Sequence, residues 1–339
     1  MKTSRSSSAR PSRFSSPSPS ARSTPGTGCR SASASRTPCR PKIARVSRPD
    51  GHLAAFEAQR PRLLRLAYRM TGSLAEAEDV VQDAWIRWAR VEDTVDSPAA
   101  YLTRIATRLC LDRADSARAR RETYYGAWLP DPLVETTEME IMADDITLTL
   151  MLALERLSPL ERAAFLLHDV FDMELADVAT TLDRDPAAVR QLAVRARRHV
   201  EAARPRFKVE RADADRLARA FFAASRDGDT AALASLLAQD VTLTSDGGGK
   251  VIAFRNVITG IAKVMRLFAG LRRKFEERPE ILEWVTIDGL PGYVTRDRGG
   301  IFQTTALDIR DGRIAAIYMT RNPDKLGHVA QAIGYSADI

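Results

Sequence analysis

Apolar residues recur at helical spacing through much of the chain. Leu66 and Met70 fall on one face of a first helix, and Val81 and Trp85 fall on one face of a second. The tripeptide Thr71-Gly72-Ser73 separates the two helices, and Ser73 is the predicted N-cap of the second. Ser97-Pro98 opens a third helix in the same way, with proline at its first position. The pattern predicts an all-α domain over residues 51–121.

The hydrophobic pattern changes twice farther along the chain. Residues 122–145 lose the periodicity and combine glycine, prolines and an acidic stretch, which predicts an irregular linker. Helical spacing resumes over residues 146–204. In the last part, 209–339, one helix over 212–225 is followed by short β-like runs at 241–244, 250–255, 281–287, 292–295, 301–309 and 314–318.

Two Asp-Gly pairs, Asp288-Gly289 and Asp311-Gly312, lie between β-like runs and are typical of hairpin turns. The predicted fold class is therefore multi-domain. Two all-α domains, the second a helix-turn-helix, precede one α+β domain.

Charge is distributed unevenly along the chain. The first 49 residues hold eleven Lys and Arg and no acid, so a net charge of +7 leaves −4 for the remainder. Residues 1–50 consist almost wholly of Ser, Arg, Pro, Ala, Thr and Gly, which predicts a disordered tail. An organelle transit peptide and a true start near Val46 are alternatives. Any case for nucleic-acid binding must therefore rest on local patches.

The three cysteines, Cys29, Cys39 and Cys110, form no C-x-x-C motif. This pattern argues against a disulfide framework and against a zinc ribbon, and it fits a reducing cytoplasm. No apolar run is long enough to span a bilayer. We expect a cytoplasmic protein without a membrane partner, metal or cofactor.

The most specific local pattern is L157-SPLERAAFLLHDVFDMELADVATTLDRDPAAVRQLAVRARRHV-200. It predicts a helix capped by Ser158, a short helix over 174–182, a turn, and a helix beginning at Pro186. Small Ala179 and apolar Val189 suit the close crossing of a helix-turn-helix. Seven arginines against two acids across 184–206 favour DNA contact over a merely solvated basic helix. The candidate contacts on the last helix are Arg190, Gln191, Arg195, Arg197 and Arg198.

This segment resembles the −35-reading domain of bacterial sigma factors, with their L-S-P-x-E-R and A-V-R-x-L-x-x-R-A-R patterns. The stretch Y68-RMTGSLAEAEDVVQDAWIRWAR-90 resembles the part by which small sigma factors bind core RNA polymerase. The resemblance implies polymerase contacts from Asp79, Gln82, Asp83 and Trp88, although the two tryptophans Trp85 and Trp88 should lie mostly in the core. It also implies that the third helix faces the −10 element, with Arg104, Arg108 and Arg113 at phosphates. The two domains and their linker are similar to the extracytoplasmic-function class.

The last part of the chain resembles the SnoaL-like domain of the cystatin-like fold, which one branch of those sigma factors carries as a fused tail. Three motifs of that branch stand here in order, with one Asp in place of Glu. The resemblance implies that they hold the tail domain against the sigma domains and so modulate activity in cis. The implied contact residues are Trp128, Leu129, Pro130, Asp131, Pro132, Asp246, Gly247, Gly248, Gly249, Lys250, Asn322, Pro323, Asp324, Lys325 and Leu326.

The stretch D246-GGGK-250 also suggests a phosphate-binding loop. A Walker-type loop requires G-x-x-x-x-G-K-[ST] running from a strand into a helix. Here a predicted strand follows Lys250, so we interpret the glycines as a hairpin turn or a domain-contact loop in which they permit positive φ and close approach.

The sequence thus predicts an alternative sigma factor whose partners are core RNA polymerase and promoter DNA, and no enzyme. An ordinary helix-turn-helix repressor or activator is one alternative. A cystatin-like enzyme with a DNA-binding appendage is another, with Asp240, Asp246, Asp288 or Asp308 as candidate general bases. A small-molecule ligand in the tail domain is a further option.

Overall fold

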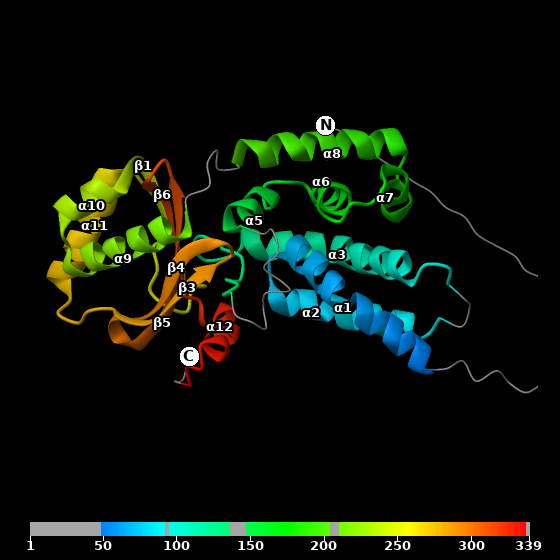
Figure 1. Ribbon diagram of the computed structural model, residues 1–339, viewed down its shortest axis with the longest axis horizontal. Helices are drawn as coiled ribbons and strands as arrows, with labels where there is room; N and C mark the ends of the chain where they lie inside the picture. Colours follow the sequence, from blue (N-terminus) through cyan, green and yellow to red (C-terminus); the bar gives the residue numbers. More distant parts are fainter. Residues whose placement is uncertain (1–48, 92–94, 136–146, 204–209, 337–339) are drawn as a thin grey trace, which may run out of the picture. The chain divides into compact units, whose positions relative to one another are not determined.

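The computed structural model describes residues 49–91, 95–135, 147–203 and 210–336 (Figure 1). The predicted tail, apart from its last two residues, lies outside these ranges. So does the acidic part of the linker, 136–145.

Three helices form the first α-helical domain: α1 Pro49–Thr71, α2 Leu74–Trp88 and α3 Pro98–Glu122. Their shared core contains Leu66, Ala77 and Leu102, each fully or almost fully buried. Gly72 has φ +71° and allows the sharp turn between α1 and α2. The three predicted helices are present. Ser73 takes the N-cap position, but its side chain makes no capping hydrogen bond to α2.

The second α-helical domain is a helix-turn-helix preceded by a short helix. Its elements are α5 Leu148–Leu154, α6 Pro159–Phe165, the π-helical turn η1 Leu166–Val170, α7 Leu175–Leu182 and α8 Pro186–Ala203. Ser158 and Glu161 form a reciprocal capping box at the start of α6. Asp183, with φ +53°, makes the turn before α8. Ala179 and Val189 are buried where α7 and α8 pack, as the sequence predicts.

The α+β domain contains one six-stranded sheet in the order β2-β1-β6-β5-β4-β3. The pairing of β1 with β6 is parallel and the other pairings are antiparallel. The strands are β1 Leu237–Asp246, β2 Ile258–Thr259, β3 Glu280–Ile287, β4 Leu290–Asp297, β5 Ile301–Arg310 and β6 Arg313–Thr320. The helices are α9 Arg211–Asp227, α10 Thr230–Leu236, α11 Ile261–Lys274 and α12 Gly327–Ala332, with 3₁₀ turns η2 Arg298–Gly300 and η3 Pro323–Lys325.

The interior between α9, α11 and the sheet is packed with aromatic side chains. Phe221 and Phe268 meet edge to face, with ring centroids 5.6 Å apart. Phe222, Trp284 and Tyr293 form a three-ring cluster with centroids 5.2 to 5.9 Å apart. This packing buries apolar area and gives the domain a core of its own.

The predicted fold class is confirmed, with two local errors. Both Asp-Gly hairpins are present, and Asp288 and Asp311 have the positive φ that such turns require. The expected strand at 250–255 is wrong, because this segment is irregular and leads to the two-residue β2. Helices α10, α11 and α12 were not expected.

Among the described residues, no helix is long and apolar enough to cross a membrane.

Candidate functional site

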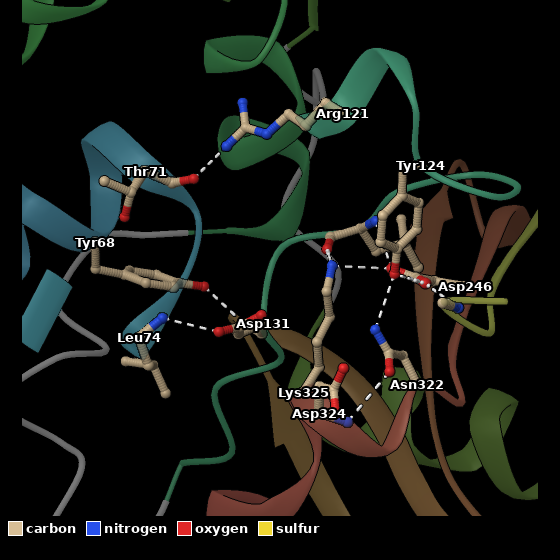
Figure 2. A network of polar contacts seen from close by, with 12 residues as sticks. Tyr68, Thr71, Leu74, Arg121, Tyr124, Asp131, Asp246, Asn322, Asp324 and Lys325 are labelled. Atoms are coloured by element: carbon tan, nitrogen blue, oxygen red, sulfur yellow. Dashed lines mark hydrogen bonds and ion pairs between the residues drawn. The ribbon is translucent and has the colours of Figure 1, made fainter. Parts of the chain in front are cut away.

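Asp246, at the end of β1, is the centre of a polar network that joins the linker to the α+β domain (Figure 2). Its side chain is fully buried. One carboxylate oxygen accepts from the Tyr124 hydroxyl at 2.5 Å and from the Gly248 N–H at 3.1 Å. The other accepts from the Leu129 N–H at 2.9 Å and from Lys325 Nζ at 3.0 Å. Four donors on one carboxylate fix the linker against the end of β1.

Lys325 supplies the charge that balances Asp246. The residue is 7% exposed, and its Nζ also donates to the Leu129 carbonyl. The same ammonium lies 4.3 Å from the ring centroid of Trp128, and the Arg121 guanidinium of α3 lies 4.2 Å from that centroid. Burial lowers the pKa of Lys325, and the Asp246 carboxylate opposes that shift. Trp128 thus contacts cations from two domains.

The triple glycine allows the loop after β1 to lie against these residues. A Cβ on Gly248 would lie 2.5 Å from the Asn322 side chain, and Gly248 has φ +62°. Asn322 Nδ2 donates to the Tyr124 hydroxyl at 2.9 Å. A Cβ on Gly249 would lie 3.2 Å from Tyr125. The D-G-G-G-K stretch is therefore a close-packed contact loop. No helix follows it directly, as a Walker-type phosphate loop would require.

Asp131 joins the linker to the first helical domain. Its Oδ2 accepts from the Leu74 N–H at 2.8 Å, so it caps α2 in place of Ser73. Its backbone N–H donates to the Gly72 carbonyl at 3.0 Å, and its carbonyl accepts from the Tyr68 hydroxyl at 2.8 Å. Burial raises the pKa of Asp131. A Cβ on Gly72 would lie 2.6 Å from the Trp128 ring, so glycine is also needed for this packing.

Asp288, at the tip of the β3–β4 hairpin, contacts three other parts of the chain. Its backbone N–H donates to the Leu133 carbonyl at 2.8 Å, and its Oδ2 accepts from the Leu133 N–H at 3.2 Å. Its carbonyl accepts from the Leu148 N–H of α5 at 2.9 Å, and Tyr68 Oη of α1 lies 3.5 Å from its Oδ1. Burial raises the pKa of Asp288 to about 8. This hairpin tip links the α+β domain to the linker and to both helical domains.

The linker continues along the edge of the sheet. Val134 forms a β-bridge with Ile287, and the Glu135 N–H donates to the Thr286 carbonyl at 3.0 Å. His328 of α12 lies 2.7 Å from the Pro132 carbonyl through its ring Nε2. The described part of the linker is thus held on the α+β domain from Leu129 to Glu135.

Two arginines join the helical domains directly. Arg162 of α6 donates to the Met70 carbonyl at 2.7 Å and pairs with Glu155 at 2.9 Å. Arg121 of α3 donates to the Thr71 carbonyl and pairs with Glu155. These carbonyls are at the C-terminus of α1, where cations are stabilised. In addition, α3 packs against α6 and α7.

The predicted interdomain residues fall into two groups. Trp128, Leu129, Asp131, Asp246, Gly248, Asn322 and Lys325 take part in the contacts described above, and Pro130 and Pro132 are buried beside them. By contrast, Lys250 pairs with Asp324 at 2.6 Å at the surface. Gly247 packs within its own loop and Pro323 begins η3. Leu326 is buried in an apolar cluster that also contains Val134 of the linker and Leu148 of α5.

The predicted polymerase contacts lie on α2. Asp79 and Gln82 are exposed, and Asp83 is half-buried and pairs with Arg113 of α3 at 2.6 Å. Trp88 is 2% exposed and its Nε1 donates to the His52 carbonyl at 2.9 Å. Its burial removes it from any partner-binding surface, so Trp88 is a core residue here.

The predicted DNA contacts lie on α3 and α8. Arg104 packs over Tyr101 with its guanidinium 5.4 Å from the ring centroid, and Arg108 is exposed. On α8, Arg195 pairs with Glu161 at 2.7 Å and Arg197 pairs with Asp169 at 2.5 Å. Of the predicted contacts on α8, Arg190, Gln191 and Arg198 are exposed and make no ion pair with any described residue.

Sequence reasoning missed Tyr68, Tyr124, Arg162 and the linking role of Asp288. The adjacent pair Tyr124-Tyr125, just before the tryptophan motif, is a signal that could have pointed to the linker contacts. For Tyr68, Arg162 and Asp288 the sequence does not indicate the interdomain partners, because these lie 63, 92 and 220 residues away.

Comparison with known proteins agrees with the architecture. Residues 55–120 match Sigma-70 region 2, and residues 147–200 match Sigma-70, region 4. The ECF RNA polymerase sigma factor SigJ of Mycobacterium tuberculosis is 37% identical over 80% of this chain and 92% of its own length. The probable ECF RNA polymerase sigma factor SigI of the same species is 31% identical over 85% of this chain and 99% of its own.

The fold comparison covers the same extent. The crystal structure of M. tuberculosis SigJ superposes with a TM-score of 0.66 at 34% identity, over 81% of this chain and 98% of that one. The similarity thus extends over most of both chains. The chain belongs to the extracytoplasmic-function family of RNA polymerase sigma factors.

Proposed function

We propose that this sigma factor binds core RNA polymerase through the exposed acids of α2, faces the −10 element with α3 and reads the −35 element with α8. We further propose that the α+β domain modulates initiation in cis, because it holds the two helical domains in a compact arrangement. The observation that carries the proposal is the packing of α3 and α8 against the same two helices, α6 and α7, which lie between them in Figure 1.

That packing is incompatible with simultaneous binding of both promoter elements. Helices that share one intervening layer lie ~20 Å apart between their axes. The −10 and −35 elements are separated by about 25 base pairs, which is ~85 Å at ~3.4 Å per base pair. The helical domains must therefore separate before α3 and α8 can both contact DNA.

The linker network supports the compact arrangement. Asp131 and Trp128 contact the corner between α1 and α2, and Asp246 and Lys325 hold the same linker on the α+β domain. Asp288 then contacts α1 and α5 directly. The two helical domains can separate only if part of this network breaks. The free energy of the network therefore sets the fraction of molecules in which the domains are separated.

Two other functions have less support. An ordinary repressor would not require the acidic face of α2. Two of the candidate general bases of the α+β domain are already engaged, because Asp246 accepts from four donors and Asp308 pairs with Arg310 at 2.7 Å. The three-ring cluster of Phe222, Trp284 and Tyr293 takes up interior space that a small-molecule ligand would need.

The test is in vitro transcription with core polymerase and genomic promoter fragments. Lys325→Met removes the buried cation, and Lys250→Met removes an exposed cation from the neighbouring motif. We expect more initiation from Lys325→Met than from the wild type and no change from Lys250→Met. Binding of duplex DNA without any polymerase-dependent initiation would support the repressor instead.

A further inference from the structure

Helix α11 of the α+β domain carries a concentrated positive charge. Its fourteen residues include five Lys and Arg and no acid. The two helices that pack beside it differ: α9 has four arginines and three aspartates, and α10 has no charged residue. The first acids after α11 are Glu276 and Glu277. Glu277 accepts a hydrogen bond from the Gly299 N–H.

Four of the five cations lie along one exposed stripe. Lys263, Arg266, Arg273 and Lys274 are exposed, and their spacing places them on one helical face. The opposite face, with Val264 and Phe268, is buried in the domain core. The fifth cation, Arg272, lies off the stripe, where its Cβ and Cγ pack close to Gly228.

No stripe cation pairs with a carboxylate among the residues that the structure describes. Arg266 bonds its own helix through the Ala262 carbonyl, and Lys274 lies over Phe275. In contrast, α9 places Arg216 and Arg226 in ion pairs with Asp213 and Asp227. Uncompensated cations on one face make a local positive potential that attracts an anionic surface.

Gly270 lies in the middle of the stripe and has no structural reason to be glycine. Its φ is in the ordinary range, and a Cβ there would meet nothing within 4 Å. Glycine inside a helix is less stable than alanine. A glycine permits close approach of a ligand to the backbone, and here it would let a phosphate lie between the flanking cations.

The chain also keeps the start of the α+β domain close to the end of α8. Helix α8 ends at Ala203 and α9 begins at Arg211, so seven residues join the DNA-reading domain to the α+β domain. Seven residues span at most ~25 Å. Such a short tether gives the stripe a high effective concentration at the duplex beside the −35 element.

We propose that the stripe of Lys263, Arg266, Arg273 and Lys274 binds the phosphate backbone of duplex DNA next to the site of α8. This inference rests on the promoter binding proposed above and extends it to the α+β domain. The contact is independent of base sequence, because lysine and arginine meet only phosphates there.

The experiment measures the affinity of the full chain for a 40-base-pair duplex of random sequence over a series of KCl concentrations. Each phosphate contact contributes about −0.9 to the slope of log affinity against log salt. The triple variant Lys263→Gln, Arg266→Gln, Arg273→Gln should make the slope shallower by up to about 2.7. The matched control Arg216→Gln, Arg226→Gln, Arg296→Gln loses the same charge from ion-paired positions and should keep the wild-type slope.

Two substitutions of Gly270 distinguish the effect of a negative charge on DNA binding from the effect of side-chain size. Gly270→Glu should weaken DNA binding more than Gly270→Gln, which has the same size, while both raise the melting temperature. Equal slopes for the stripe variant and its control would overturn the inference, and so would a stripe variant that loses affinity for core polymerase alone. Absence of promoter binding by the complex of the wild type with core polymerase would instead refute the promoter binding on which the inference rests.

Discussion

The α+β domain contains two Lys–Asp ion pairs in different environments. Lys325 and Asp246 are buried and exchange hydrogen bonds with the linker, whereas Lys250 and Asp324 are more than half exposed. A buried charge that loses its partner is strongly destabilising, whereas an exposed pair contributes little. Motif membership alone therefore does not tell which lysine is important for interdomain contact.

Loss of the buried lysine should destabilise the protein far more than loss of the exposed one. Lys325→Met leaves the Asp246 carboxylate buried without a cation, so we expect a decrease of about 3–5 kcal/mol in the free energy of unfolding. Lys250→Met should change it by less than about 1 kcal/mol. Urea denaturation of both variants measures the difference, and equal effects would show that burial does not distinguish the pairs.

Asp288 should make stability depend on pH. Its pKa of about 8 in the folded state exceeds that of an unfolded aspartate, near 4, so only the folded chain keeps the proton between these values. Its contribution is fully present below pH 4 and is lost as the pH rises to 8, by up to about 1.4 kcal/mol per unit. Asp288→Asn keeps a neutral side chain that tolerates positive φ.

The measurement is urea denaturation of Asp288→Asn and the wild type between pH 5 and 8. The variant should gain stability relative to the wild type as the pH rises. Asp311→Asn, in the other Asp-Gly turn at similar φ but exposed, is the control and should show no such trend. A pH-independent difference for Asp288→Asn would mean that this carboxyl is already ionised in the folded protein.

Elements with a local signal could be predicted from the sequence, and those set by distant contacts could not. The capping box of Ser158 and the two Asp-Gly turns determine where α6 and the hairpins lie. The 250–255 segment is a short apolar run that resembles a strand, but β1 pairs instead with β6, some 70 residues later and in parallel. Ile252 is left 83% exposed, so no sheet face covers it. Tertiary pairing overrides β-propensity here.

The contact loop after β1 should depend on glycine for reasons of space as well as conformation. Gly248→Ala and Gly299→Ala both introduce a side chain at positive φ, which costs about 1–3 kcal/mol. A methyl group at Gly248 would also meet Asn322, whereas nothing lies within 4 Å of the position at Gly299. We expect Gly248→Ala to lower the melting temperature more, and equal decreases would contradict the close approach.

At the scale of the whole molecule, domain order and motifs were predictable, but the contacts were only partly so. The three motifs indicated that the linker, the glycine loop and the C-terminal segment come together, and Asp246, Asn322 and Lys325 do meet the linker. The contacts that Arg121 and Arg162 make with α1, and the approach of Asp288 to Tyr68 across 220 residues, have no pattern in the sequence. Side-chain contacts between domains depend on the folded surfaces of both.

The separation of the two helical domains before and after polymerase binding tests directly whether the compact arrangement opens. Dyes on Ala89→Cys beside α2 and Ala187→Cys on α8, with Cys29 and Cys39 replaced by serine and Cys110 buried, report it by energy transfer. We predict high transfer in the free protein, lower transfer in Lys325→Met, and a large decrease on binding core polymerase and promoter DNA. High transfer that persists in an initiating complex would contradict the account.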